Sequence, residues 1–162
     1  MYRVEAGIPT SPVTLQEAKQ HLRVDHDDED SLIESLLISA TQYGEGYQRR
    51  FYARRQVYVY HDSLPPAWRV PFAPVVSVDA LKIDGVPVAY TLTSSGWLMS
   101  ESTGDATVVM TVGYDPEDIP ATVKQAVLLL VGHWYQHREA ADAGRDEIPF
   151  GVGALLDMGR VY

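Results

Sequence analysis

Two histidines, His133 and His137, have the spacing that a metal site on a helix requires. Residues four apart lie on one helix face, so both imidazoles could ligate one ion, with Glu139 or Asp142 as a third ligand. In the zinc-protease pattern a glutamate follows the first histidine, whereas this chain has Trp134 there. We therefore interpret the pair as surface or interface histidines, and we expect neither a metal nor another cofactor.

A run of acidic residues at positions 25–30 could bind calcium. An EF-hand loop needs a glycine at its sixth position and a glutamate at its twelfth. Counted from Asp25, these positions hold Asp30 and Leu36, so the pattern fails. We interpret the run as a solvated helix start, and an acidic surface that faces DNA or a partner subunit is the alternative.

Carboxylates also gather at Asp115, Glu117 and Asp118, and paired carboxylates can do acid–base chemistry. These three lie among turn residues, with no apolar surroundings to raise a pKa. The chain has no nucleophile-elbow pattern and no phosphate-binding loop. The sequence therefore predicts that the protein is not an enzyme, and a dispersed carboxylate or histidine site is the less favoured alternative.

Basic residues are concentrated in one short segment. Four of the 13 lysines and arginines fall within seven positions, namely Arg49, Arg50, Arg54 and Arg55. A cationic end to a helix complements the helix dipole, and this is the simpler interpretation. A contact patch for an acidic partner or for the DNA backbone is the functional alternative.

The elements that must position these residues begin with two helices. Thr14, with Glu17 three residues later, forms a capping-box signature and predicts a short helix over residues 15–22. A long helix of about 23 residues should follow, with Asp27 as its N-cap. Its apolar stripe consists of Leu32, Ile33, Leu36, Leu37, Ala40, Tyr43, Tyr47 and Phe51. Gly44 and Gly46 interrupt this helix, and they allow a bend or the close approach of a neighbour.

The middle of the chain changes to strand patterns. Residues 57–60 and 75–83 are rich in β-branched and aromatic side chains, and the dipeptide at 84–85, Asp-Gly, is a hairpin signal. Further short strands are predicted over residues 88–92, 96–99 and 106–112. These patterns predict a small antiparallel β-domain.

A helical pattern resumes after Pro120, a residue that suits the first turn of a helix. This helix is apolar nearly all round, so we expect it to be buried in the core or against another subunit. We expect it to end near Arg138, and a polar loop over residues 139–150 should separate it from one short C-terminal helix. Its predicted inner face is Val123, Ala126, Val127, Leu130, Val131 and Trp134.

The patterns together predict an α+β fold. It should be mainly an α-helical bundle, made of a short helix, a long helix, a late long helix and a short C-terminal helix, with an inserted small antiparallel β-domain. We expect residues 1–56 and 114–162 to form the helical domain and residues 57–113 to form the inserted β-domain.

Composition limits the classes of function. The 162 residues suit one domain with a small insertion, and no apolar run approaches the ~20 residues needed to cross a bilayer. There is no cysteine and no signal-peptide pattern, so we expect a soluble protein in a reducing cytoplasm. The net charge of -9 disfavours tight DNA binding. It does not disfavour loose passage of DNA, because an acidic wall would repel the DNA and keep it mobile.

Several segments together resemble one protein family. The segment at 12–15, Pro-Val-Thr-Leu, precedes an acidic helix start and a long helix, and strand patterns precede the last long helix. That helix carries Leu-Leu-Leu-Val-Gly-His-Trp-Tyr-Gln-His-Arg-Glu-Ala at 128–140, and Pro-Phe-Gly-Val follows at 149–152. With this layout the chain resembles the adaptor (head-tail connector, head-completion) proteins of tailed bacteriophages.

The resemblance implies a virion structural protein, assembled in the host cytoplasm and located in the neck. About twelve copies would form a ring under the portal protein, extend the DNA channel, and offer a platform to the stopper or tail-completion protein. Genomic DNA would pass through without sequence-specific binding, and no membrane would be involved. Another ring-forming component, such as a stopper or tail terminator, is the alternative, although those tend to be β-rich throughout.

The resemblance also suggests which residues make contacts. Its C-terminal segment should be the portal anchor, with Val152, Leu155, Leu156, Met158 and Arg160 as the contact residues. For the subunit interface or the channel wall, we expect the acidic residues Asp27, Asp28, Glu29, Asp30 and Glu34, and the basic residues Arg49, Arg50, Arg54 and Arg55. In a ring, two different faces of each copy must meet, so the acidic start of the long helix could meet the arginine segment of a neighbour.

Overall fold

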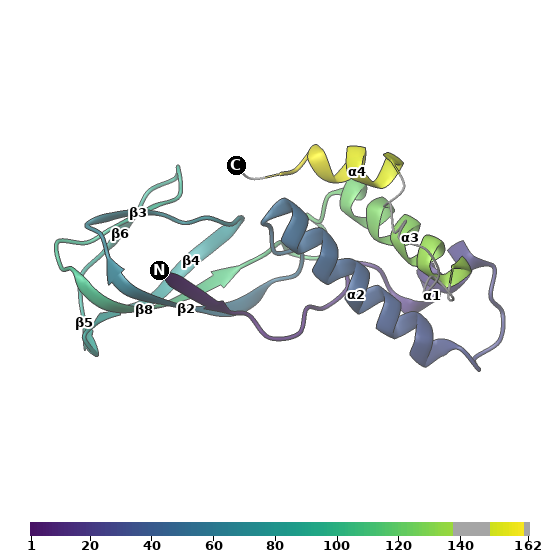
Figure 1. The fold of residues 1–162 in the computed structure, drawn as a ribbon, viewed down its shortest axis with the longest axis horizontal. Helices are drawn as coiled ribbons and strands as arrows, with labels where there is room; N and C mark the ends of the chain where they lie inside the picture. Colours follow the sequence, from purple (N-terminus) through teal and green to yellow (C-terminus); the bar gives the residue numbers. More distant parts are fainter. Residues whose placement is uncertain (138–149, 161–162) are drawn as a thin grey trace.

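The computed structural model describes residues 1–137 and 150–160, and it has an elongated shape. Four helices lie at one end and two antiparallel sheets at the other, as Figure 1 shows. Each end has its own core of buried apolar side chains. The predicted α+β class is confirmed.

The helical end contains α1 (Leu15–Leu22), α2 (Asp30–Gln48), α3 (Ala121–Gln136) and α4 (Phe150–Asp157). Helix α2 packs against α3, and both contact α1 and α4. The core between them includes Ile33 and Leu37 from α2 and Leu130 and Val131 from α3, each at most 3% exposed. Among the described helices, none combines the length and apolar character that a membrane crossing demands.

The larger sheet has the order β1-β2-β8-β4-β5 and is antiparallel throughout. Its strands are β1 (Tyr2–Glu5), β2 (Arg55–Leu64), β8 (Gly104–Val112), β4 (Val75–Ile83) and β5 (Val86–Pro87). A smaller sheet, in the order β3-β7-β6, contains β3 (Ala67–Arg69), β7 (Trp97–Met99) and β6 (Thr91–Leu92). Alternate residues of β2 and β8 face the apolar core at the sheet end of the molecule, because side chains along a strand alternate between its two faces.

Several local predictions are confirmed. Thr14 caps α1, and Glu17 completes the capping box by accepting from the Thr14 backbone N–H at 2.7 Å. Asp84 and Gly85 both have positive φ, 51° and 79°, in the tight turn between β4 and β5. Residue types that tolerate left-handed backbone therefore marked this hairpin correctly.

The long helix is shorter than predicted. Helix α2 has 19 residues and begins at Asp30, and Asp27 does not cap it because its carboxylate is bound by Lys19 at 2.6 Å. At the other end Arg49 adopts the left-handed conformation (φ 53°), which stops the helix. Phe51 therefore leaves the helical stripe and packs edge-to-face on Phe72 beside the sheet.

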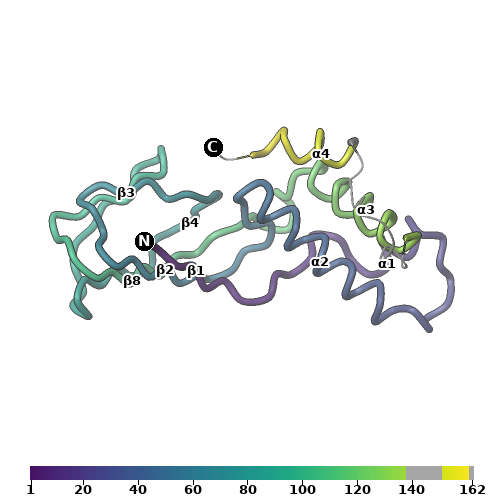
Figure 2. The backbone as a smooth tube through the Cα atoms, in the orientation of Figure 1, coloured from purple at the N-terminus to yellow at the C-terminus, as the bar shows by residue number. Residues whose placement is uncertain are grey.

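The other helix boundaries also differ in detail. Pro120 is the N-cap of α3 rather than part of its first turn, and α3 ends at Gln136. Arg138 and most of the expected 139–150 loop lie outside the described residues. The N-terminal segment, expected with the helices, supplies β1, which pairs with β2 at the edge of the large sheet. Figure 2 shows how the chain then runs from this strand to α1.

Gly44 provides a direct test of helix packing. A Cβ at this position would lie 2.6 Å from the hydroxyl oxygen of the buried Tyr52, which itself donates to Gln48 Oε1 at 2.8 Å. We expect Gly44→Ala to lower the free energy of unfolding by about 1–3 kcal/mol, because the buried ring must move. Urea denaturation measures the change.

Gly46, two residues further along α2, is the matched control, because a Cβ there would meet nothing within 4 Å. Gly46→Ala should raise the free energy of unfolding by up to about 1 kcal/mol through helix propensity alone. Equal effects of the two substitutions would contradict the packing argument.

Candidate functional site

The two histidines lie at the C-terminal end of α3. Their rings are 4.6 Å apart between centroids, and the ring of His137 contacts the backbone oxygen of His133 through Nδ1 at 2.8 Å. In residues 1–137 and 150–160, no group of three or more histidine, aspartate or glutamate side chains could hold a metal ion. Glu139 and Asp142, the suggested third ligands, lie outside the described residues.

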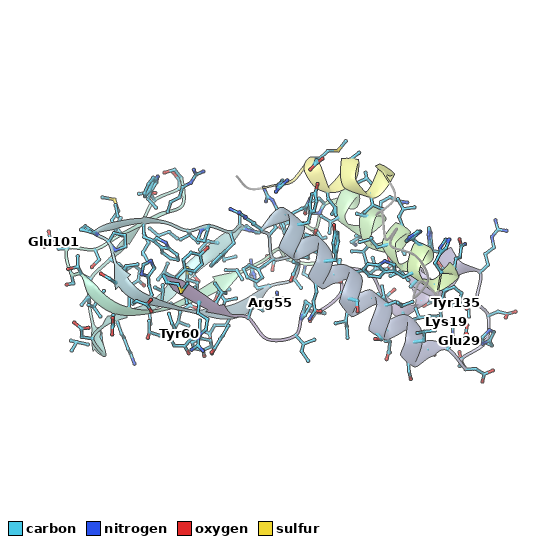
Figure 3. All side chains as sticks on the ribbon, viewed as in Figure 1. Lys19, Glu29, Arg55, Tyr60, Glu101 and Tyr135 are labelled. Atoms are coloured by element: carbon cyan, nitrogen blue, oxygen red, sulfur yellow. The ribbon has the colours of Figure 1, made fainter. Side chains whose placement is uncertain are left out.

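The acidic segment is organised by two side chains from other elements. Lys19 on α1 binds the carboxylates of Asp27 and Asp30 at 2.6 and 2.7 Å, and Tyr135 on α3 donates to Glu29. Figure 3 shows Lys19, Glu29 and Tyr135 together at the helical end of the molecule. The Lys19 ammonium holds the pKa of Asp27 below its ordinary value.

Three other acidic side chains, two of them within this segment, are exposed to solvent. Asp25, Asp28 and Glu34 are exposed, and the side chain of Asp28 is 95% accessible. Asp28 lies 3.9 Å from His26 Nδ1. This end of the molecule therefore presents carboxylates on a loop that Lys19 holds in shape.

The arginine segment does not form the cationic helix end that the sequence suggested. Helix α2 stops before it, and the four guanidinium groups go to different places. Arg54 pairs with Asp115 at 2.8 Å, and Arg50 donates to the backbone oxygen of Gly159 and to the hydroxyl of Tyr114. Asp115 thus forms an ion pair between the segment that enters β2 and the segment that leaves β8.

Arg55 forms a buried ion pair with Glu45 of α2, at 2.6 Å between Nη2 and Oε2. Glu45 also accepts from the backbone N–H of Tyr52 at 2.8 Å, and Arg55 stacks on the Phe51 ring. Burial raises the pKa of Glu45, while the bonds from Tyr52 and Arg55 oppose that rise. Sequence reasoning missed Glu45, because a glutamate between two glycines and off the predicted apolar stripe gives no signal of burial or of a partner ten residues away.

A cleft of about 450 Å³ lies above this ion pair. Its lining comes from β1 and the segment after it, from the C-terminal end of α2, and from residues 71–72. Three arginines, at positions 49, 50 and 55, and one glutamate, Glu45, contribute charge, so the lining carries a net charge of +2. Arg49 is exposed and makes no ion pair within the described part of the chain.

The predicted C-terminal anchor is folded onto the chain's own helices. Val152 and Leu156 of α4 are at most 1% exposed, and Leu155 is half-buried against the same core. Gln48 donates to the backbone oxygen of Leu156 at 2.6 Å, and Tyr47 donates to Asp157 at 2.8 Å. Deletion of residues 152–162 would therefore open the helical core rather than leave the fold intact.

Two members of that anchor set remain accessible. Met158 is 74% exposed, and the Arg160 guanidinium lies 5.0 Å from the centre of the Tyr47 ring. Both follow the end of α4, near the C-terminal end of α2 (Figure 1). Point substitutions of exposed residues here test a docking role more cleanly than a truncation does.

A family model for phage gp6-like head-tail connector proteins matches residues 12–84, which is slightly less than half of the chain. That region holds α1, α2 and the first strands that follow them. No curated protein sequence matches the chain significantly. The predicted resemblance to head-tail connector proteins is confirmed by the family match.

Solved structures match over the whole chain. A chain of a native gene transfer agent (GTA) virion is 26% identical, with a TM-score of 0.76, and the match covers 100% of this chain and 96% of that one. Chains from the neck of an empty GTA particle (C6 symmetry) and of a native GTA particle (C12 symmetry) have TM-scores of 0.81 and 0.75, at 24% and 23% identity. Both cover 100% of this chain and 96% of the other, and at these identities they establish the fold.

The buried ion pair predicts a pH-dependent defect. In Arg55→Met, Glu45 loses its cation, so its pKa in the folded state should rise further above the unfolded value. A raised folded-state pKa means that stability is retained when the carboxyl is protonated and is lost as the pH rises. We expect a loss of about 3–5 kcal/mol at pH 7.5 and a clearly smaller loss at pH 5, measured by urea denaturation.

The double variant Glu45→Gln/Arg55→Met is the control, because it removes both charges from the junction. It should show none of the additional loss at pH 7.5 that Arg55→Met shows, because no carboxylate is left at the junction without a cation. If the single variant showed the same deficit at both pH values, the defect would not arise from the charge on Glu45.

Proposed function

We propose that the chain is a structural protein of the neck of a phage-like particle, without enzymatic activity, and that copies of it form a ring between head and tail. The observation that carries this proposal is the similarity to a chain of a native GTA virion, which spans both chains almost completely. The match to the head-tail connector family over the N-terminal half supports it independently.

The finer role that we propose is that of the adaptor. The ring would dock under the portal protein, continue the DNA channel, and carry the stopper or tail-completion protein. Relatives of the same fold belong to particle necks solved with C6 and C12 symmetry, which supports a ring of about twelve copies. The net charge of -9 supports passage of DNA without tight binding, because acidic walls repel the phosphate backbone.

In this role the helices act as a bundle that faces the portal, and residues 57–113 act as an inserted β-domain. We propose α4 as the element that contacts the portal. Val152, Leu155 and Leu156 would hold it on the bundle, since they are buried or half-buried there. Met158 and Arg160 would then contact the portal directly, because they follow the helix and reach the surface.

The direct experiment is the light-scattering mass of the chain mixed with the portal protein of the same genome. A gain equal to about twelve subunits of 18.0 kDa per portal is the expected result. Absence of co-migration at every salt concentration would overturn the adaptor role. Binding to an assembled adaptor ring instead would identify a stopper.

Met158→Asp should weaken portal docking, because it replaces an exposed apolar side chain beside α4 with a charged one. Val86→Asp is the matched control: Val86 is 61% exposed but lies at the β4–β5 hairpin, in the other half of the molecule. We expect the number of bound copies per portal to fall only for Met158→Asp. Equal docking by both variants would contradict the proposed contact between α4 and the portal.

A further inference from the structure

The cleft above the Glu45–Arg55 pair is a positive concavity in an acidic protein. The charge of Glu45 is already matched by Arg55, so the excess charge of the lining comes from Arg49 and Arg50. Arg50 has hydrogen bonds within the chain, whereas Arg49 is exposed and has no carboxylate partner in the described ranges. Arg49 is therefore the cation available to an incoming group.

Apolar surface accompanies this charge. The Phe51 and Phe72 rings meet edge-to-face, 5.2 Å apart between centroids, and both line the cleft with Pro9 and Pro71. The Gly46 side of the cleft is open, since a Cβ there would meet nothing within 4 Å. The concave shape admits a narrow peptide segment, and the Arg49 cation favours one with exposed carboxylates.

The chain itself carries such a segment at the other end of α2. In the loop before this helix, Lys19 binds Asp27 and Asp30 while Tyr135 binds Glu29, which leaves Asp25 and Asp28 directed into solvent. Because these bonds already fix the loop, little conformational entropy would be lost when it docks. The loop is therefore an acidic surface whose shape is set before it docks.

We propose that the cleft receives the acidic loop, residues 25–28, of an adjacent copy of this chain, and that Asp25 and Asp28 of that copy pair with Arg49. This inference rests on the proposed ring and names its contact. The 19 residues of α2 separate loop and cleft by about 28 Å at 1.5 Å per residue, so one copy cannot make the contact within itself. Figure 3 shows the separation, with Arg55 near the middle of the molecule and Lys19 at its helical end.

Two distinct faces on each copy make a heterologous contact, which can propagate around a ring and close it. DNA fits the cleft less well than a peptide does. The cleft is concave and partly apolar, and the whole chain carries a net charge of -9 that repels phosphates. DNA binding that depends on Arg49 would overturn the proposal.

The absence of native cysteine gives a clean cross-linking test. The double variant Asp28→Cys/Arg49→Cys, assembled on the portal, should form a ladder of disulfide-linked dimers, trimers and higher species on mild oxidation. A disulfide within one chain is excluded, because it needs Cα atoms within about 7 Å. The control Asp28→Cys/Arg69→Cys places the second thiol on exposed β3, outside this cleft, and should give no ladder.

Charge exchange provides a second measurement, on a separate set of variants. Arg49→Glu and Asp25→Arg/Asp28→Arg should each weaken ring assembly by roughly tenfold, and their combination in one chain should restore it. Arg69→Glu and Glu101→Arg/Glu117→Arg are the matched charge controls at exposed sites elsewhere, and they should assemble normally.

The outcomes separate this inference from the proposed function. Rings that assemble on the portal without a ladder overturn the loop-in-cleft contact but leave the adaptor role intact. A ladder in concentrated protein that never binds the portal supports the contact and overturns the adaptor role. Loss of duplex DNA binding by Arg49→Glu, with ring assembly unchanged, also overturns the contact.

Discussion

The buried pair between Glu45 and Arg55 joins the two halves of this molecule. Glu45 belongs to the last turn of α2, Arg55 begins β2, and Tyr52 between them donates its backbone N–H to the same carboxylate. Two charges removed from water are tolerated only when they are close and hydrogen-bonded. The chain therefore turns between Gln48 and Arg55, and the helices and the sheet meet at this turn.

Other features of the junction follow from this turn. Tyr52 is fully buried and lies against Gly44, which leaves no room for a Cβ. Gly113 allows the backbone of Ala53 to approach, with φ of 96° at the glycine, so the end of β8 passes close to the start of β2. Helices and sheets are thus connected by several interlocking contacts rather than by a flexible linker.

The position of this junction also decides where each side chain of the arginine segment lies. Because α2 ends at Gln48, the guanidinium groups of Arg50, Arg54 and Arg55 reach three different partners at the joint between helices and sheet. Arg49 alone is left at the rim of the cleft, and Arg50 also reaches the end of α4 through Gly159. A surface that could contact another copy and the segment proposed for the portal therefore lie side by side.

Local chemistry in the sequence determined the parts of the fold that depend on near neighbours. The capping box at Thr14, the hairpin at Asp84, the main strands and the helical patterns are properties of a few consecutive residues, and these were predicted correctly. The head-tail connector resemblance was also visible, because it rests on the order of such segments.

Only the tertiary structure decided where the charges and the last helix go. Asp27 was expected to cap α2, but Lys19 from another helix binds it, and Glu45 gave no signal of its partner at Arg55. The C-terminal segment was expected to be a portal anchor, and only the structure shows that its Val152 and Leu156 complete the chain's own core. The physical reason is common to all three: ion pairs and apolar burial depend on distances in space, and those distances arise only after the local elements have packed.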